Sequence, residues 1–379
     1  MYELSLNIID MLLIFLFIWL GISMFIANPV QGAYFRWLTR GITIFMLFLV
    51  GKEMIRTSDD LWTVTTIFAA QGLIMGVMGI IEGFFQINIW LLLSPFLTPT
   101  WKPIYMEYHL EMLLGKIVRI KGPFFHPVHY GQYLAFLLPF CIGIMSRKRM
   151  LGIIAFPLAL LAMIFTQTRS AYIAAIVSLV VFIFFAKLKI AVKTLVVVIL
   201  GSTIIAFFFS PYLIDLYEHR ILETVHSDGI YHSEMLARIK TPGIILNAVV
   251  RESPSFGFGP HLKDNDFVNI FSEGEIVMNE TPYAVMGAFE HGVPYFLGVE
   301  IYFGGIMMFM VYLVMHYRKG KDMDKYGLSL IFLTAFAASM VTLHIQQLGE
   351  TLSNIIIVFA GIQSVYYHEK YILKSMSNR

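Results

Sequence analysis

The sequence predicts an all-α fold: a polytopic membrane helical bundle of about ten spans with a large extracytoplasmic loop. Hydrophobic residues make up 58% of the 379 residues and charged residues only 14%, whereas a soluble domain has about 25% charged residues. Apolar runs recur along the chain, and about 17–25 such residues cross a bilayer as a helix. Many charged residues and several histidines between Leu213 and Glu280 interrupt this pattern, which predicts one long loop.

The predicted spans follow one another along the whole chain, with ends that the pattern places to within a few residues. No Lys or Arg precedes the first span, so we expect a membrane helix there rather than a cleavable signal. The spans are Asn7–Ala27, Leu38–Gly51, Leu61–Ile81, Gln132–Met145, Leu151–Phe165, Ser170–Ala186, Ile190–Ser210, Val293–His316, Gly327–His344 and Thr351–Tyr367.

Lysines and arginines predict the orientation, because cytoplasmic connections carry an excess of both. The excess falls on one side of the predicted bundle, which places both termini in the cytoplasm. The loops Glu82–Gly131 and Pro211–Thr281 then lie outside. Arg36 and Arg40 also fall on the outer side, which is an exception to the cytoplasmic excess of basic residues. The cytoplasmic clusters are Lys52 with Arg56, Arg147–Arg149, Lys187–Lys193, Arg318–Lys325 and Lys370–Arg379.

This topology divides the chain into four consecutive segments. Residues 1–131 hold the N-terminal helices and the first outer loop, and residues 132–210 hold the central helices. Residues 211–281 form the large extracytoplasmic loop, and residues 282–379 hold the C-terminal helices. The single cysteine, Cys141, excludes an intramolecular disulfide framework. The net charge of +2 gives no indication of nucleic-acid binding, and we expect no nucleic-acid partner.

The motif Thr-Gln-Thr-Arg-Ser at Thr166–Ser170 places Arg169 between two spans, at the predicted outer surface. A guanidinium at membrane depth is costly and is treated as functional by default. Its planar fork suits the oxygens of a phosphate. The alternative is an interfacial arginine that extends to water and takes no part in chemistry.

A second motif, Lys-Gly-Pro-Phe-Phe-His-Pro at Lys121–Pro127, opens the fourth span. Pro and Gly predict a loop that leads into a helix. His126 and His129 could bind a metal, but no carboxylate or cysteine lies nearby in the sequence to complete a site. A structured turn with hydrogen-bonded histidines is the alternative, and we expect no metal.

The large loop contains an amphipathic helix over Ser233–Val250, which carries Arg238. A Gly/Pro turn follows at Ser253–Pro260, and its lone G-x-G is a weak nucleotide signal. Asp264-Asn265-Asp266 could bind a metal or form a turn. Glu280 lies where the loop returns to the membrane. Tyr283, Glu290 and His291 follow it.

The order of these motifs resembles the O-antigen ligase/polymerase family of membrane glycosyltransferases, which have the GT-C type of fold. The resemblance runs from about Arg119 to the C-terminus. It implies that Arg169 and Arg238 hold the diphosphate of an undecaprenyl-linked glycan. The ligases have a His-Asn pair near the end of the outer loop. This chain has none, which favours the polymerase branch. Glu280 takes the place of the histidine when the motifs are matched on Tyr283, and Thr281 does when they are matched on Gly292. Glu280 is the first choice of base, with Glu290 and His291 as alternatives.

These observations predict an enzyme in the bacterial inner membrane. We expect it to polymerise undecaprenyl-diphosphate-linked repeat units on the extracytoplasmic face, without a cofactor and with a flippase and a chain-length regulator as possible partner proteins. A ligase acting on another acceptor and a transporter of lipid-linked oligosaccharides are the alternatives. The residues expected to bind substrate, besides Arg169 and Arg238, are His126, Arg251, Tyr283, Glu290 and His291.

Overall fold

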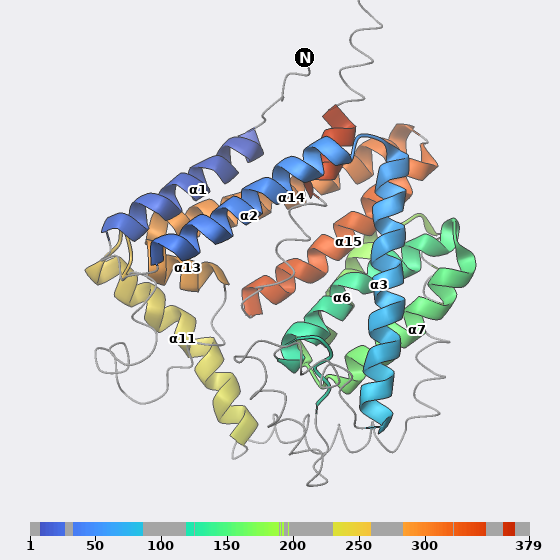
Figure 1. Cartoon of the computed structure of the whole chain (residues 1–379), viewed down its shortest axis with the longest axis horizontal. Coiled ribbons are helices and arrows are strands. Elements are labelled where there is room, and N and C mark those ends of the chain that lie inside the picture. Colours follow the sequence, from blue (N-terminus) through green and yellow to red (C-terminus); the bar gives the residue numbers. More distant parts are fainter. Residues whose placement is uncertain are drawn as a thin grey trace, which may run out of the picture. The chain divides into compact units, whose positions relative to one another are not determined.

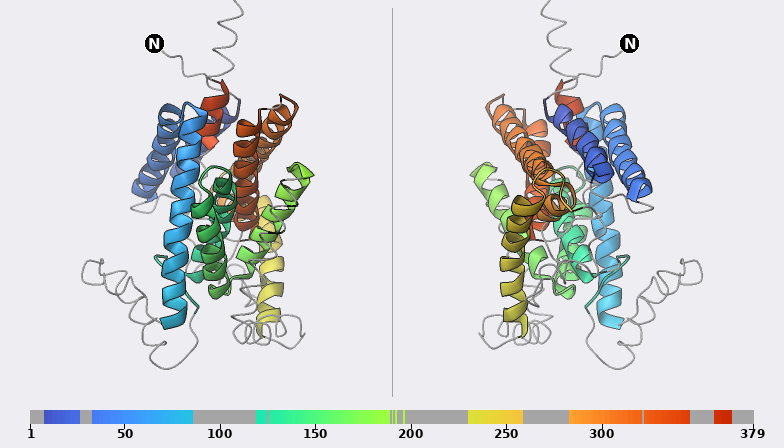
Figure 2. Two further views of the ribbon diagram at one scale, coloured as in Figure 1. Left: turned by 90° about the vertical axis from the view of Figure 1, so that its right-hand side faces the viewer. Right: turned by 90° about the vertical axis from the view of Figure 1, so that its left-hand side faces the viewer.

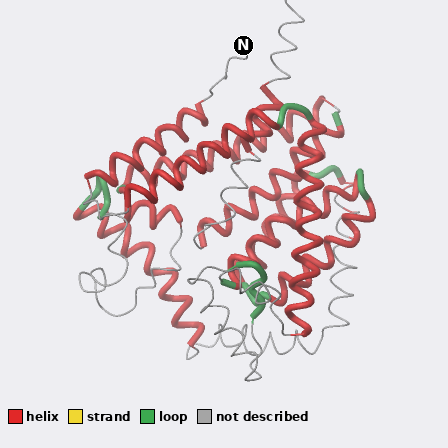
Figure 3. The backbone as a smooth tube through the Cα atoms, viewed as in Figure 1, coloured by secondary structure: helices red, strands yellow, loops and turns green. Residues whose placement is uncertain are grey.

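The computed structural model describes residues 8–26, 33–85, 119–124, 126–188, 190, 192, 196, 230–258, 283–320, 322–345 and 359–367. Almost all of this part of the chain is helical, and no described residue belongs to a strand (Figures 1 and 3). Four helices are long and apolar enough to cross a membrane. The prediction of a helical membrane protein is therefore confirmed at this level.

Most predicted spans coincide with observed helices, some of which extend further than predicted. The span predicted at Ile190–Ser210 lies almost wholly outside the described residues, and the last predicted span is described only over residues 359–367. The count of about ten spans stays a prediction. The helices are α1 (Ile8–Ile26), α2 (Ala33–Met54), α3 (Ser58–Phe85), α6 (Pro127–Gly143) with the 3-10 turn η2 (Ile144–Ser146), α7 (Arg149–Phe165), α8 (Arg169–Phe185), α11 (Ile230–Glu252), α13 (Tyr283–His291), α14 (Val293–Gly320) and α15 (Met323–Ile345).

Helix α3 begins earlier than the apolar run because polar residues cap it. The Thr57 hydroxyl accepts a hydrogen bond from the Asp60 backbone N–H at 3.2 Å, and the Asp60 carboxylate accepts one from the Thr57 N–H at 2.8 Å. This reciprocal pair satisfies two N–H groups at the start of the helix. Hydropathy alone does not register such a start, since its residues are polar.

The chain forms two compact units, each assembled from stretches that are distant in sequence. The first unit comprises Met1–Arg56, Ile214–Phe309 and Leu343–Arg379, and the second comprises Thr57–Leu213 and Met310–Thr342. The four consecutive segments expected from the sequence describe the order of spans and loops rather than compact units, and they stay a prediction. Helices α14 and α15 contribute residues to both units.

In the second unit, α3 lies along α6 and α7 (Figure 2). A row of glycines on α3, at Gly72, Gly76, Gly79 and Gly83, makes this approach close. A Cβ atom at Gly76 would lie 2.7 Å from the α7 backbone, and one at Gly79 would lie 2.7 Å from the Tyr130 hydroxyl. Small residues spaced by three or four positions allow membrane helices to pack closely. The glycine spacing therefore selects the face of α3 that meets its neighbours.

In the first unit, an ion pair joins α1 to α2. The fully buried Asp10 carboxylate binds the Lys52 ammonium, whose side chain is 9% exposed. The Ser364 hydroxyl donates a hydrogen bond to the Lys52 carbonyl at 2.7 Å, which attaches the last described helix to α2. An apolar cluster joins α11 to α13 in the same unit and comprises Ile245, Val249, Val285, Met286 and Phe289.

Candidate functional site

Two of the sequence motifs meet in the second unit. The residues around Lys121 and Gly122 lie against the turn Thr166–Ser170, beside the end of α3 at Glu82. We call this set the motif junction. Its centre is inaccessible to water, since Glu82, Lys121, Thr166 and Thr168 are all buried. The junction is built from polar groups that are more than 35 residues apart in the sequence, which local pattern does not reveal.

Glu82 holds the first motif in place. One of its carboxylate oxygens accepts a hydrogen bond from the Lys121 N–H at 3.0 Å, and the other accepts one from the Gly122 N–H at 2.9 Å. Gly122 has φ of +53°, in the left-handed region that favours glycine. Hydrogen bonds to an ionised group are stronger than neutral ones. Sequence reasoning passed over Glu82, although an acid at the end of an apolar helix is itself a signal.

Arg119 fixes the second motif. Its Nε donates to the Thr166 carbonyl at 2.9 Å, and its Nη2 donates to the Thr168 hydroxyl at 3.1 Å. The Thr168 hydroxyl in turn lies 3.3 Å from the carbonyl of Pro127. No local motif singles out Arg119, which lies where the resemblance begins. Its contacts make it a positioning residue for the turn that leads to Arg169.

The turn between α7 and α8 contains a backbone conformation that is rare for its residue type. Gln167 has φ of 51°, and it is the one non-glycine residue with positive φ in the described part of the chain. Such a conformation costs about 1–2 kcal/mol for a residue with a side chain, and it tends to occur at functional sites. The turn reverses the chain and starts α8 at Arg169.

The start of α8 carries partial positive charge. Thr168 is the N-cap residue, but its side chain makes no capping hydrogen bond because its hydroxyl contacts Arg119 and Pro127 instead. A helix N-terminus attracts anions, and the half-buried Arg169 adds a guanidinium at that point. Ser170 follows, buried, within 3.4 Å of the Gln132 amide. The arrangement can stabilise a negatively charged group such as a phosphate.

His126 and His129 form a helix start. His126 is exposed, and its Nδ1 accepts a hydrogen bond from the Val128 N–H at 3.3 Å as the N-cap of α6. Pro127 occupies the first helical position, where its missing N–H costs nothing. The centroids of the two imidazole rings lie 6.2 Å apart. These contacts favour the structured turn over a metal pair. Within the described residues, no group of three or more His, Cys, Asp or Glu could hold a metal ion.

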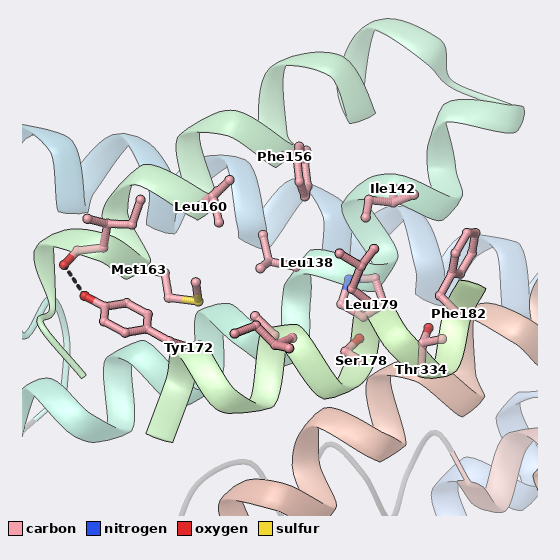
Figure 4. Close-up of a pocket in the computed structure, with 14 residues that line it drawn as sticks. Leu138, Ile142, Phe156, Leu160, Met163, Tyr172, Ser178, Leu179, Phe182 and Thr334 are labelled. Carbon is pink, nitrogen blue, oxygen red and sulfur yellow. Dashed lines mark hydrogen bonds between the residues drawn. The ribbon is translucent and has the colours of Figure 1, made fainter. Parts of the chain in front are cut away.

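An apolar cavity of about 270 Å³ lies beside the motif junction, between α6, α7, α8 and α15 (Figure 4). Tyr172 stands at one end of it, one helical turn after Arg169, and donates a hydrogen bond to the Ile164 carbonyl at 2.8 Å. Phe182 lies toward the other end of the close-up, and Phe156 lies between the two ends. An apolar chain attached to an anion at Arg169 could enter this space.

The first unit contains the predicted residues Glu290 and His291. His291 is buried, and its Nδ1 lies 2.8 Å from the Ser23 hydroxyl. Its carbonyl accepts a hydrogen bond from the Trp19 indole at 3.0 Å, and its ring packs on Tyr295. Glu290 lies 3.6 Å from the His291 Nε2. These contacts tie α1 to the end of α13, as expected of packing residues.

Beside His291, the turn Ser253–Phe258 packs against the corner Phe289–Val293, and we call this contact the glycine corner. The Phe258 N–H donates to the Phe289 carbonyl at 2.7 Å, and the Val293 N–H donates to the Pro254 carbonyl at 2.8 Å. Gly257 and Gly292 have φ of 69° and 85°. The predicted Gly/Pro turn is therefore a backbone-to-backbone contact.

The remaining predicted residues are placed only in part. Arg238 lies on α11 and Tyr283 is the first residue of α13, but the structure describes neither side chain. Arg251 is exposed in the last turn of α11. Glu280 and the Asp264-Asn265-Asp266 motif lie outside the described residues. Of the predicted site, the structure thus brings the turn that carries Arg169 next to the His126 loop, and it pairs Glu290 with His291.

Comparisons with known proteins do not assign a family. No protein-family model matches the chain, and no curated protein matches it. The resemblance described above therefore rests on the motifs and on their order alone.

Proposed function

We propose that this chain is a membrane glycosyltransferase of the GT-C type with about ten spans. It polymerises undecaprenyl-diphosphate-linked oligosaccharide repeat units into a cell-surface or secreted polysaccharide. The reaction takes place on the extracytoplasmic face of the bacterial inner membrane. The observation that carries the proposal is the motif junction, because it joins two separate motifs around the start of α8 and places Arg169 there.

In this proposal Arg169 and the first turn of α8 bind the diphosphate of the donor. Both are suited to stabilise the negative charge that builds up as the diphosphate leaves. Arg238 supplies a second guanidinium. The apolar cavity beside Tyr172 accommodates part of the polyprenyl chain, which keeps the diphosphate at the motif junction.

The transfer exchanges one bond for another. The acceptor hydroxyl attacks the anomeric carbon of the donor sugar opposite the leaving group, and a new C–O bond forms. The bond between that carbon and the diphosphate oxygen breaks, and its electron pair leaves with the diphosphate. Glu280 takes the proton of the acceptor hydroxyl as general base. Arginines neutralise the diphosphate, so no metal has a role in this scheme.

The test replaces Arg169 with lysine, which keeps the charge and removes the planar fork. Arg149→Lys is the matched control, because Arg149 is an exposed arginine at the start of α7. We expect Arg169→Lys to lower the rate of polymer formation by about 10²–10³, the usual effect of losing one contact to a developing charge. Lipid-linked single repeat units should accumulate in those cells.

The readout is the amount and length of polymer and of lipid-linked glycan, at equal protein level. Full-length polymer from Arg169→Lys contradicts the role of Arg169. Normal polymer length with loss of transfer to a final acceptor supports the ligase alternative instead. Accumulation of lipid-linked units on the cytoplasmic side supports a transporter.

A further inference from the structure

The second unit contains a larger cavity at the opposite end of α8 from Arg169. Its volume is about 640 Å³, within the range of about 300–1,000 Å³ typical of ligand sites. It is lined by residues of α3, of α6 with η2, of α8 and of α15. The Lys/Arg pattern predicts that the connections around this cavity lie on the cytoplasmic face.

One wall of the cavity is a satisfied ionic cluster. The Arg147 guanidinium donates to Asp59 at 3.1 Å and to Asp324 at 2.8 Å. It also lies over the Trp62 ring, 4.5 Å from the ring centroid, and the Trp62 indole N–H donates to Asp324 at 3.0 Å. Arg147 is therefore neutralised by protein carboxylates. Its role is to hold α3 and α15 together at the rim.

Lys187 lies at this rim, and the part of the chain that the structure describes supplies no counter-charge to it. Its ammonium lies 2.8 Å from the Met323 sulfur and 5.4 Å from the centroid of the Tyr326 ring. Both of these partners line the cavity. A thioether is a weak acceptor, and among the described residues Lys187 has no carboxylate partner. By contrast, the neighbouring Lys325 binds Asp322 at 3.3 Å.

The interior of the cavity is apolar. Its walls include Ile142, Phe182, Ile190 and Leu330. Gly327 of α15 also lines it, and a Cβ atom at that position would meet nothing within 4 Å. The cavity thus has an apolar interior, with the Lys187 ammonium at its rim and the exposed Lys148 and Arg149 in the connection that follows Arg147.

We propose that this cavity binds an anionic phospholipid, with its phosphate at Lys187 and one acyl chain between α6, α8 and α15. Basic pockets between membrane helices on the cytoplasmic side are suited to anionic headgroups. A free phosphate would leave the apolar interior of the cavity unfilled, whereas an acyl chain would fill it. The cation at the rim favours an anionic headgroup over a zwitterionic one. This site is separate from the motif junction and does not depend on the proposed function.

The test measures the thermal stability of the delipidated full-length protein in detergent as lipid is added. A lipid that binds only the folded state raises the Tm. Dioleoyl phosphatidylglycerol should raise the Tm in a saturable way. Dioleoyl phosphatidylcholine and inorganic phosphate should do so much less. Equal shifts with the two lipids, or a full shift with phosphate alone, overturn the proposal.

Two variants locate the site. Lys187→Gln should weaken the apparent affinity for phosphatidylglycerol about fivefold, the effect of losing roughly 1 kcal/mol from one lysine near an anionic headgroup. Lys148→Gln is its control, since Lys148 is exposed and, unlike Lys187, does not contact the lining residues Met323 and Tyr326. Equal weakening by both variants would mean general surface attraction and would overturn the proposal.

Gly327→Leu fills the cavity with a good helix former and should abolish the lipid-dependent shift. Gly304→Leu is the control, because Gly304 also has open space around it but lies outside the cavity. A shift that persists in Gly327→Leu contradicts occupation of the cavity. If Gly327→Leu yields no folded protein, the comparison of Lys187→Gln with Lys148→Gln decides the question.

Discussion

The motif junction and the glycine corner are both tight contacts between motifs, but they are made from different groups. Side chains make the motif junction: Glu82 binds the Lys121 and Gly122 backbone, and Arg119 binds the Thr166 carbonyl and the Thr168 hydroxyl. Backbone groups make the glycine corner, where two N–H···O=C bonds run between the turn and the helix ends.

The two kinds of contact have different consequences: one sets the path of the backbone, and the other fixes the positions of charged groups. Two backbones can come this close only where no side chain separates them. Glycines in the sequence therefore mark such a contact. A contact between side chains fixes polar and charged groups in position, including the arginine beside it. We infer that the turn Ser253–Phe258 sets the path of the chain, while the turn Thr166–Ser170 holds the Arg169 cation in position.

The largest effect should come from Gly292→Ala in the glycine corner. Its φ of 85° is unfavourable for alanine, and the added Cβ would overlap the Ser255 carbonyl. We expect a loss of about 2–5 kcal/mol in the free energy of unfolding, from the left-handed conformation and the overpacking together. Thermal unfolding of the purified protein measures it. Gly304→Ala, with open space at its Cβ, should be as stable as the parent, and equal losses in the two variants would contradict the assignment.

Glu82→Gln should destabilise the motif junction by about 1.5–3 kcal/mol, because it removes charge-assisted bonds to two buried N–H groups. An amide can accept at only one of its two terminal atoms, so one N–H faces an NH₂ group. Denaturant or thermal unfolding gives the change. Glu53→Gln, at an exposed glutamate paired with Arg56, is the control and should change stability little. Unchanged stability in Glu82→Gln would mean that the carboxylate charge is not needed.

His291→Phe sharpens the comparison further, because it removes one side-chain contact beside the glycine corner. We expect a loss of about 1–2 kcal/mol, since the bond to the buried Ser23 is lost. Polymer formation per folded molecule should stay unchanged if His291 only packs α1 against α13. A large fall in polymer at normal protein level would instead make His291 part of the chemistry.

The smallest effect, with the opposite sign, should come from Gln167→Gly. Glycine adopts positive φ without strain, so the variant should be more stable by up to about 1 kcal/mol. If the strain at Gln167 positions Arg169, polymer formation should fall while stability rises. Measuring both on the same preparation separates the two effects. A variant that loses stability would show that side-chain contacts of Gln167 outweigh its backbone strain.

Local signals explain what could be predicted. The amphipathic helix predicted at Ser233–Val250 is confirmed as part of α11, since its apolar spacing is a local property. The Pro127 start of α6 and the turn at Ser253–Phe258 also follow from Pro and Gly. The predicted base Glu280 and the pairing of Arg169 with Arg238 stay predictions, because they concern residues or side chains outside the described part.

The sequence by itself determined the membrane class, the positions of most helices and the two motifs Lys121–Pro127 and Thr166–Ser170. Each depends on residues within about one or two helical turns of one another, or on the length of an apolar run. Tertiary structure alone decided that Glu82 binds the Lys121–Gly122 backbone, that Arg119 holds Thr168 and that His291 faces Ser23. Those contacts join residues from 39 to 268 positions apart. Which residues become partners depends on which helix faces pack together, and that packing is seen only in the folded chain.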